Sequence, residues 1–513
     1  MRQVFICVSL MLAVPAMASV KPGDAVMPVF AFGETGAAFG TCFAVGDGRH
    51  LVTTADNVIE ELGPSVKSTM RRAVVVSPWT GDIHQARVEK VDQAANLALL
   101  KLEKDTLPTL AMATAPRRLP FATLGQLMDD ASALGGRWPT VMYNYAVEVE
   151  DERTSYVARE WQGESAFMTE FGGKRWLFLK DVKPEDRTRG GGPVVVEGNG
   201  IVGVYVSRFL IESGSKTEEQ RLCVPLTEAM KFLDAAGLSA DQLRNPAKIE
   251  GDRADQSKMS FQAAWRALSN VVGENWSGAV ADAKALTELR PRSAQVWLLY
   301  GVALAGSGKA EEAVKAYDTA VNLDAGLAVA YLHRGIAYGI LDKKKEAEED
   351  FRKAIELDSN DINSHMWLSR LLSADESKRD EAVRSAGQAV RLSPNSPFTR
   401  LNLALVILAA GGDREAAISE LQKALEIAPA FQEARLALAA NYRELRRIED
   451  AEREYRALVT AEPNNPVTLL ELAAFLIEQD KVDEAKQLVS QVMEMDLPEP
   501  IKEAAQELRG KTE

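Results

Sequence analysis

Seven alanines recur along the C-terminal half of this chain at an almost constant interval of 34 or 35 residues. They are Ala279, Ala313, Ala347, Ala382, Ala417, Ala451 and Ala485. A proline follows four of them after twelve residues, at Pro291, Pro394, Pro429 and Pro463, where it would end a helix. Such a period is typical of solenoids, in which each unit buries its apolar face only by stacking on its neighbours. The period therefore predicts a solenoid of seven stacked units.

The residues around these alanines resemble the tetratricopeptide repeat (TPR). The best copy contains Trp297, Tyr300, Gly301, Ala313, Tyr317 and Ala320. The resemblance implies seven TPR repeats over residues 259–498 and a capping helix over 499–513. It implies an all-α array, in which each repeat is a pair of antiparallel helices that touch at the alanine. The fourth and fifth repeats depart from the family pattern. Arg370 and Leu405 are assigned to the position where a small residue usually lets the helices approach, and each of these repeats carries one extra residue.

The same resemblance implies that the first helices of the repeats line a concave face that binds a protein or peptide partner. In this register the face contains Leu298, Leu332, Ile336, Trp367, Leu371, Asn402, Leu436, Arg443 and Leu470. These residues predict a mainly apolar groove with polar points at Asn402 and Arg443. The alternative for any single one of them is a place in the core. The Lys/Asn clamp with which some relatives hold a C-terminal carboxylate is not evident.

Residues 21–238 have the pattern of an all-β domain. Alternating or β-branched runs, many of them separated by Gly, Asp or Pro, predict thirteen short strands followed by a helix from Pro225 to about Gly237. The strands are 28–32, 40–45, 50–54, 72–76, 85–91, 97–102, 140–149, 154–162, 165–171, 175–180, 192–196, 201–206 and 221–224. Many short strands of this kind indicate a sandwich or a barrel.

Three segments in this domain resemble the trypsin-like serine proteases, in the chain order of that family. Residues 40–58 resemble the segment that carries the catalytic histidine, residues 92–101 the segment with the aspartate, and residues 188–194 the serine loop. The resemblance covers about 200 residues. It implies a multidomain fold, in which a trypsin-like all-β double barrel precedes the TPR solenoid.

The catalytic residues themselves are missing. The triad needs a hydroxyl nucleophile, an imidazole base and a carboxylate, but the matched positions hold Gly190, Asp56 and Asn96. The resemblance leaves the amides of Thr188 and Gly190 as vestigial oxyanion-hole donors. We therefore expect a catalytically inactive domain, either a structural module or a binder of uncleaved peptide. The alternatives are an active serine-type endopeptidase with a rearranged site and, for the three glycines from Gly190, a simple flexible turn.

The N-terminus has the features of a secretory signal peptide over residues 1–18, with an apolar run and an Ala16-Met17-Ala18 cleavage pattern. The alternative is a short membrane anchor. A signal peptide predicts an exported protein, periplasmic or secreted, without a membrane span after cleavage. Residues 239–258 are polar and predict a linker.

The remaining chemistry is sparse. Cys42 and Cys223 remain after signal cleavage and form either one disulfide or two buried thiols. With these two cysteines and four histidines, the sequence predicts no metal and no cofactor. The net charge of −14, without Lys/Arg clusters, argues against nucleic acid as a partner.

Overall fold

The structure is a computed structural model, and it divides the chain into two compact units. One consists of residues 1–59 and 69–299, the other of residues 60–68 and 300–513. The residues described are 26–33, 37–63, 66–78, 80–104, 106–107, 109, 140–150, 153–163, 165–171, 174–180, 193–196, 200–213, 216–244, 257–495 and 497–512. The predicted signal peptide and the predicted oxyanion-hole residues Thr188 and Gly190 lie outside them.

Six antiparallel strands close into a barrel in the order β1-β2-β3-β8-β7-β6. Its core consists of apolar residues such as Met27, Val29, Leu51, Val75 and Leu100, all fully buried. The strands are β1 (Val26–Phe32), β2 (Ala37–Val45), β3 (His50–Thr53), β6 (Arg72–Val76), β7 (Ile83–Asp92) and β8 (Leu97–Leu102). The 3₁₀ helix η2 (Ala55–Asn57) follows β3, and β4 (Ile59–Gly63) pairs with β5 (Val66–Thr69). The first barrel of the predicted double barrel is therefore present.

The second group of strands forms a seven-stranded sheet in the order β10-β9-β13-β14-β15-β12-β11. The strands are β9 (Thr140–Glu150), β10 (Arg153–Gly163), β11 (Ser165–Phe171), β12 (Lys174–Lys180), β13 (Pro193–Val196), β14 (Gly200–Ser213) and β15 (Lys216–Pro225). A barrel closes only when its two edge strands pair. In the described residues β10 pairs with β9 and β11 pairs with β12, so the second predicted barrel is an open sheet here.

Cys42 in β2 and Cys223 in β15 are both buried, and no disulfide joins them. Burial raises the pKa of the Cys42 thiol far above its ordinary value, because the thiolate would lose its hydration. Of the two alternatives from the sequence, the structure has the two buried thiols. Helix α2 (Leu226–Asp234) follows β15, and Gly237 beyond it has a left-handed φ of 87°, as its predicted place at the end of the helix requires. The short helix α3 (Ala240–Arg244) lies within the predicted linker.

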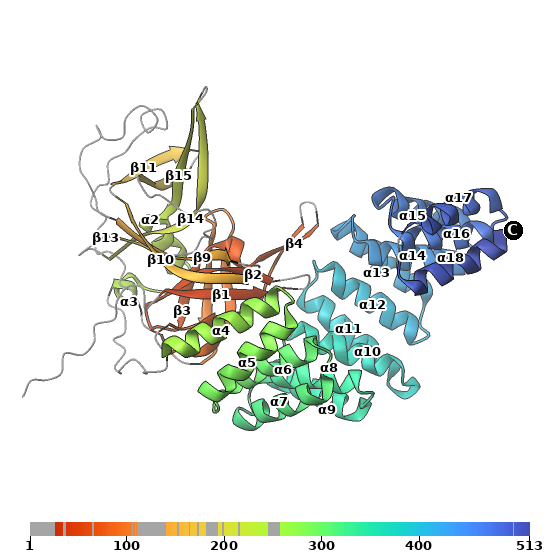
Figure 1. The fold of residues 1–513 in the computed structure, drawn as a ribbon, viewed down its shortest axis with the longest axis horizontal. Helices are drawn as coiled ribbons and strands as arrows, with labels where there is room; N and C mark the ends of the chain where they lie inside the picture. The colour runs from red at the N-terminus through yellow and green to blue at the C-terminus, as the bar shows by residue number, and fades with distance from the viewer. Residues whose placement is uncertain are drawn as a thin grey trace, which may run out of the picture. The chain divides into compact units, whose positions relative to one another are not determined.

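In the described residues from 257 onward, helices follow one another as seven pairs and a final helix. Figure 1 shows how they succeed one another. The pairs are α4 (Ser257–Val272) with α5 (Trp276–Leu289), α6 (Ala294–Gly306) with α7 (Ala310–Leu323), α8 (Ala328–Ile340) with α9 (Lys344–Leu357), α10 (Ile362–Ser373) with α11 (Arg379–Leu392), α12 (Pro397–Ala409) with α13 (Arg414–Ile427), α14 (Gln432–Glu444) with α15 (Ile448–Ala461), and α16 (Pro466–Glu478) with α17 (Val482–Met493). The last helix is α18 (Glu499–Thr512).

The first helix pair belongs to the same unit as the barrel. Trp265 of α4 packs on Phe30 of β1, with their ring centroids 5.1 Å apart. Helix α18 packs against α16 and α17, where Ala505 joins Leu469 and Val492 in one core cluster. The division at residues 299 and 300 falls after the first pair, whereas the sequence places the boundary at 239–258. The predicted domain limits stay predictions.

The seven periodic alanines have no exposed surface, as expected where two helices touch. Two glycines on first helices show how close this contact is. A Cβ atom on Gly301 would come within 2.4 Å of the Tyr317 ring, and one on Gly335 within 2.7 Å of the Phe351 ring. Both rings are buried, so the space that they occupy requires glycine on the facing helix.

The structure corrects the predicted register of the fourth and fifth repeats. Ser369 and Ala404 have no exposed surface, whereas Arg370 and Leu405 beside them are exposed. The close-packed small residues are therefore Ser369 and Ala404. The extra residue lies in the turn between the two helices: residues 374–378 and 410–413 form longer turns than 307–309 or 341–343. The prediction was wrong because it counted backward from the alanines across these longer turns.

Among the described residues, every helix is too short or too polar to cross a membrane.

Candidate functional site

The positions matched to the histidine and the aspartate of trypsin-like proteases lie side by side. Asp56 belongs to η2, and Asn96 lies in the turn between β7 and β8 with a left-handed φ of 51°. The Asp56 amide donates to Asn96 Oδ1 at 3.3 Å, and Asn96 Nδ2 donates to Asp56 Oδ2 at 2.9 Å. Two reciprocal hydrogen bonds therefore join segments that are 40 residues apart in sequence.

This pair holds the two segments together but supplies no general base of the triad type. A carboxylate bonded to a carboxamide offers no imidazole to take and return a proton. The nearby histidine in sequence, His50, is engaged elsewhere: its Nδ1 lies 2.8 Å from Asp47 Oδ1 and its Nε2 lies 3.6 Å from Glu89 Oε2. Partial burial raises the pKa of Asp47, but hydrogen bonds from the Arg49 amide and from His50 outweigh it, so the pKa lies below its ordinary value.

A buried polar chain next to this pair was not found from the sequence. Asn57 Nδ2 donates to Thr53 Oγ1 at 2.8 Å, and Thr53 Oγ1 donates to the Thr41 carbonyl at 2.7 Å. A Cβ atom on Gly40 would lie 2.1 Å from the Asn57 side chain. Gly40 therefore leaves space for Asn57, which anchors η2 on the barrel. The available signal in the sequence was the glycine itself.

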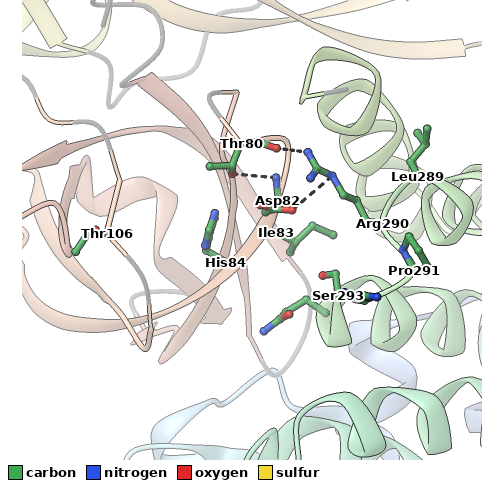
Figure 2. A pocket seen from close by; sticks show the side chains of 11 residues that line it. Thr80, Asp82, Ile83, His84, Thr106, Leu289, Arg290, Pro291 and Ser293 are labelled. Atoms are coloured by element: carbon green, nitrogen blue, oxygen red, sulfur yellow. Dashed lines mark hydrogen bonds and ion pairs between the residues drawn. The ribbon is translucent and has the colours of Figure 1, made fainter. Parts of the chain in front are cut away.

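A cavity of about 690 Å³ lies between the turn that joins β6 to β7 and the turn that joins α5 to α6 (Figure 2). Arg290 reaches from the end of α5 to the strand turn, where it donates to the Thr80 carbonyl and pairs with Asp82 at 3.6 Å. Its Nε also donates to Ser260 Oγ at 3.0 Å. These contacts satisfy the arginine, so the cavity marks the point where the first helix pair is attached to the barrel.

The nine residues predicted for partner binding differ in their exposure. Leu298, Leu332 and Asn402 are buried, and Ile336, Leu371, Leu436 and Leu470 are partly buried. Trp367 is 38% exposed. Arg443 is half-buried and donates from Nε to Glu478 Oε2 on the next first helix at 2.7 Å. Their part in partner binding stays a prediction.

The corrected register brings a different row of residues together. On each first helix from α6 to α16, the residue directly after the close-packed small residue is exposed or partly exposed. We call these residues the first-helix row: Val302, Ile336, Arg370, Leu405, Ala440 and Ala474. Arg370 and Leu405 are its most exposed members, and Leu405 is 42% exposed. The sequence alone missed both as candidates for binding, because it assigned them to the close-packed position.

Most arginines on the first helices have a carboxylate partner. Arg334 bridges Asp318 and Asp350 at 2.7 Å each, and Asp350 is only 5% exposed. The other pairs are Arg266 with Asp282, Arg400 with Glu420, Arg435 with Glu454 and Arg443 with Glu478. Most of them join a first helix to a second helix, so they stabilise the packing of the helices and leave little free charge for a ligand.

Comparison with protein families identifies the helical region. Models of the tetratricopeptide repeat match residues 266–328, 328–361, 408–466 and 447–504. Together with the seven helix pairs, these matches show that the C-terminal part of the chain is a TPR array, and such repeats bind protein or peptide partners. No curated protein matches the chain.

Solved structures that match parts of this chain differ in the share of it that they cover. The Cut9–Hcn1 assembly of the APC/C is 15% identical with a TM-score of 0.39, and the match covers 56% of this chain and 54% of that chain. Yeast Tom70 is 20% identical with a TM-score of 0.40, and coverage is 56% and 58%. YrrB, a TPR protein with an unusual peptide-binding site, is 22% identical with a TM-score of 0.30, and coverage is 36% and 95%. The chain thus spans about half the length of the first two.

Proposed function

We propose that this chain is an exported interaction scaffold, in which the TPR array binds a protein or peptide partner and the β-rich domain is an inactive trypsin-like module. The observation that carries the binding function is the first-helix row, where Leu405 is exposed and Arg370 is exposed over the ring of Trp367. Exposed aromatic and arginine side chains are the types that contribute most to protein interfaces. Export is proposed from the apolar N-terminus, with its cleavage pattern at residues 16–18.

The inactivity of the β-rich domain is supported by the pair of Asp56 and Asn96. The two residues stand at the matched triad positions, and they bond to each other instead of orienting an imidazole. Gly190, at the position of the nucleophile, has no side chain that could form an acyl-enzyme.

We expect the mature protein to show no peptide-bond hydrolysis and no labelling by a fluorophosphonate, which reacts with activated serine. The matched variant carries Gly190→Ser, Asp56→His and Asn96→Asp together. Labelling of that variant alone would support both the inactivity and the resemblance. Robust hydrolysis by the parent, after removal of contaminating protease, would instead establish an endopeptidase with a rearranged site.

Partner binding is tested by selecting phage-displayed random peptides on the immobilised full-length protein. We expect selected peptides to lose at least about tenfold in affinity when Leu405→Asp places a charge in the first-helix row, because a carboxylate would be desolvated in an apolar contact. Leu323→Asp is the matched control, since Leu323 lies on the second helix α7 and is 41% exposed, against 42% for Leu405. Equal losses in both variants would contradict binding at the first-helix row.

A further inference from the structure

Arg370 differs from the other arginines of the first helices. Each of the other five on α4–α16 has a carboxylate partner. Arg370 has none among the described residues, and its side-chain hydrogen bond is to a neutral group, from Nε to Asn402 Oδ1 at 2.6 Å. The guanidinium therefore carries a positive charge that the array itself does not neutralise.

The contacts of Arg370 fix its orientation. Asn402 has no exposed surface, and its Nδ2 donates to Ser369 Oγ at 3.0 Å, so its Oδ1 is directed at Arg370. The guanidinium carbon lies 5.6 Å from the centre of the Trp367 ring, and that ring stacks on Phe351. With Nε occupied, the edge formed by Nη1 and Nη2 remains for a ligand, and its two parallel N–H groups match a carboxylate.

The surroundings of this edge make a carboxylate more favourable than water. Burial lowers the pKa of the Arg370 guanidinium, because it removes part of the hydration of the charged form. The opposite holds for Arg334, whose pKa is raised chiefly by hydrogen bonding to Asp350. A partly dehydrated cation without a counter-charge gains more from an acidic ligand than a fully solvated one.

The neighbours of Arg370 in the first-helix row indicate which partner residues flank the carboxylate that Arg370 would bind. Ile336 on α8 and Leu405 on α12 hold the same position as Arg370 on the helices before and after it. A partner segment that contacts all three residues extends on both sides of Arg370. The carboxylate that Arg370 binds therefore belongs to a side chain inside the segment and not to its C-terminus. The net charge of −14 disfavours a polyacidic segment.

We propose that Arg370 binds the side-chain carboxylate of a single aspartate or glutamate in a protein partner, with apolar partner residues on Ile336 and on Leu405 with Trp367. This proposal rests on the proposed function and specifies the partner for the same face. Asn402 and Ser369 act as positioning residues, because they hold the guanidinium without touching the ligand.

The test uses the peptides selected on the full-length protein. We expect them to share one internal Asp or Glu between apolar residues, and a fluorescent copy of the tightest peptide to lose at least about tenfold in affinity with Arg370→Gln. Arg370→Lys should lose less, since it retains the charge without the paired N–H groups. Arg384→Gln is the matched control, because Arg384 is exposed on the second helix α11 of the same repeat. Circular dichroism on each variant verifies that the fold is retained.

The possible failures are distinguishable. Selected peptides without an acidic residue, with affinity unchanged by Arg370→Gln, would overturn the role of Arg370 and leave partner binding in place. Peptides that require only a free C-terminal carboxylate would overturn the internal acidic residue. If no peptide is enriched by the protein, the proposed function fails and this proposal fails with it.

Discussion

Replacement of Gly335 by valine is expected to lower the free energy of unfolding of the helical array by about 2–3 kcal/mol. A Cβ atom at this position would lie 2.7 Å from the Phe351 ring and 3.3 Å from the Ala347 carbonyl oxygen. Phe351 is 2% exposed and Ala347 is fully buried, so neither has space into which to move. Helix α8 would have to separate from α9, and the contact between neighbouring repeats would weaken with it.

The same helix provides the matched control for this prediction. Gly339 lies on α8 one turn later, and a Cβ atom there would meet nothing within 4 Å. Gly339→Val is expected to leave stability unchanged or to raise it by less than about 0.5 kcal/mol, because valine has a higher helix propensity than glycine. Urea unfolding followed by far-UV circular dichroism measures both variants. Similar midpoints for the two would show that the contact between Gly335 and Phe351 is not tight.

The second large effect is expected for Arg334→Gln, which should destabilise the array by about 2–3 kcal/mol. Arg334 pairs with Asp350 through two hydrogen bonds of 2.7 Å, and the Asp350 side chain is 7% exposed. Removing the guanidinium leaves a carboxylate that is buried and without its cation, which is the costly way to disrupt an ion pair. The contact of Arg334 with the Tyr331 ring, at 5.3 Å, would also be lost.

Arg352→Gln is the matched control for Arg334. Arg352 pairs with Glu348 and Glu381, but its side chain is 43% exposed, so its loss is expected to cost less than about 1 kcal/mol. In the double variant Arg334→Gln with Asp350→Asn, part of the stability should return, because the unpaired charge is removed. Equal losses for Arg334→Gln and Arg352→Gln, measured by urea unfolding, would contradict the importance of the buried carboxylate.

Much of the fold follows from local sequence patterns. All thirteen predicted strands overlap observed ones. Successive side chains of a strand point to opposite faces of the sheet, so a strand that is buried on one face shows alternating apolar and polar residues. The pair β4 and β5 was missed, and so was the extension of β14 to Ser213 and of β15 back to Lys216. Closure of a sheet depends on pairing between strands distant in sequence. No local pattern carries that information, so the open second sheet was not foreseen.

The candidate sites show the same division between local and distant information. The three protease-like segments identified Asp56 and Asn96, but their reciprocal hydrogen bonds needed the structure. In the array, counting from the small residues Gly301 and Gly335 would have reached Ser369 after another 34 residues. That count would have placed Arg370 on the exposed row. The absence of a carboxylate beside Arg370 depends on which helices meet, and the repeat pattern does not specify this.

The position of the two extra residues has a practical consequence. Residues 374–378 and 410–413 lengthen the turns between helices, while the close-packed residues Ser369 and Ala404 stay in register with Gly335. The turns between the helices of a repeat can therefore differ in length without changing which residues of the first helices are exposed. An exposed residue in these turns, such as Ser377, can be replaced by cysteine to attach a fluorophore that reports binding at the first-helix row without altering the residues of that row.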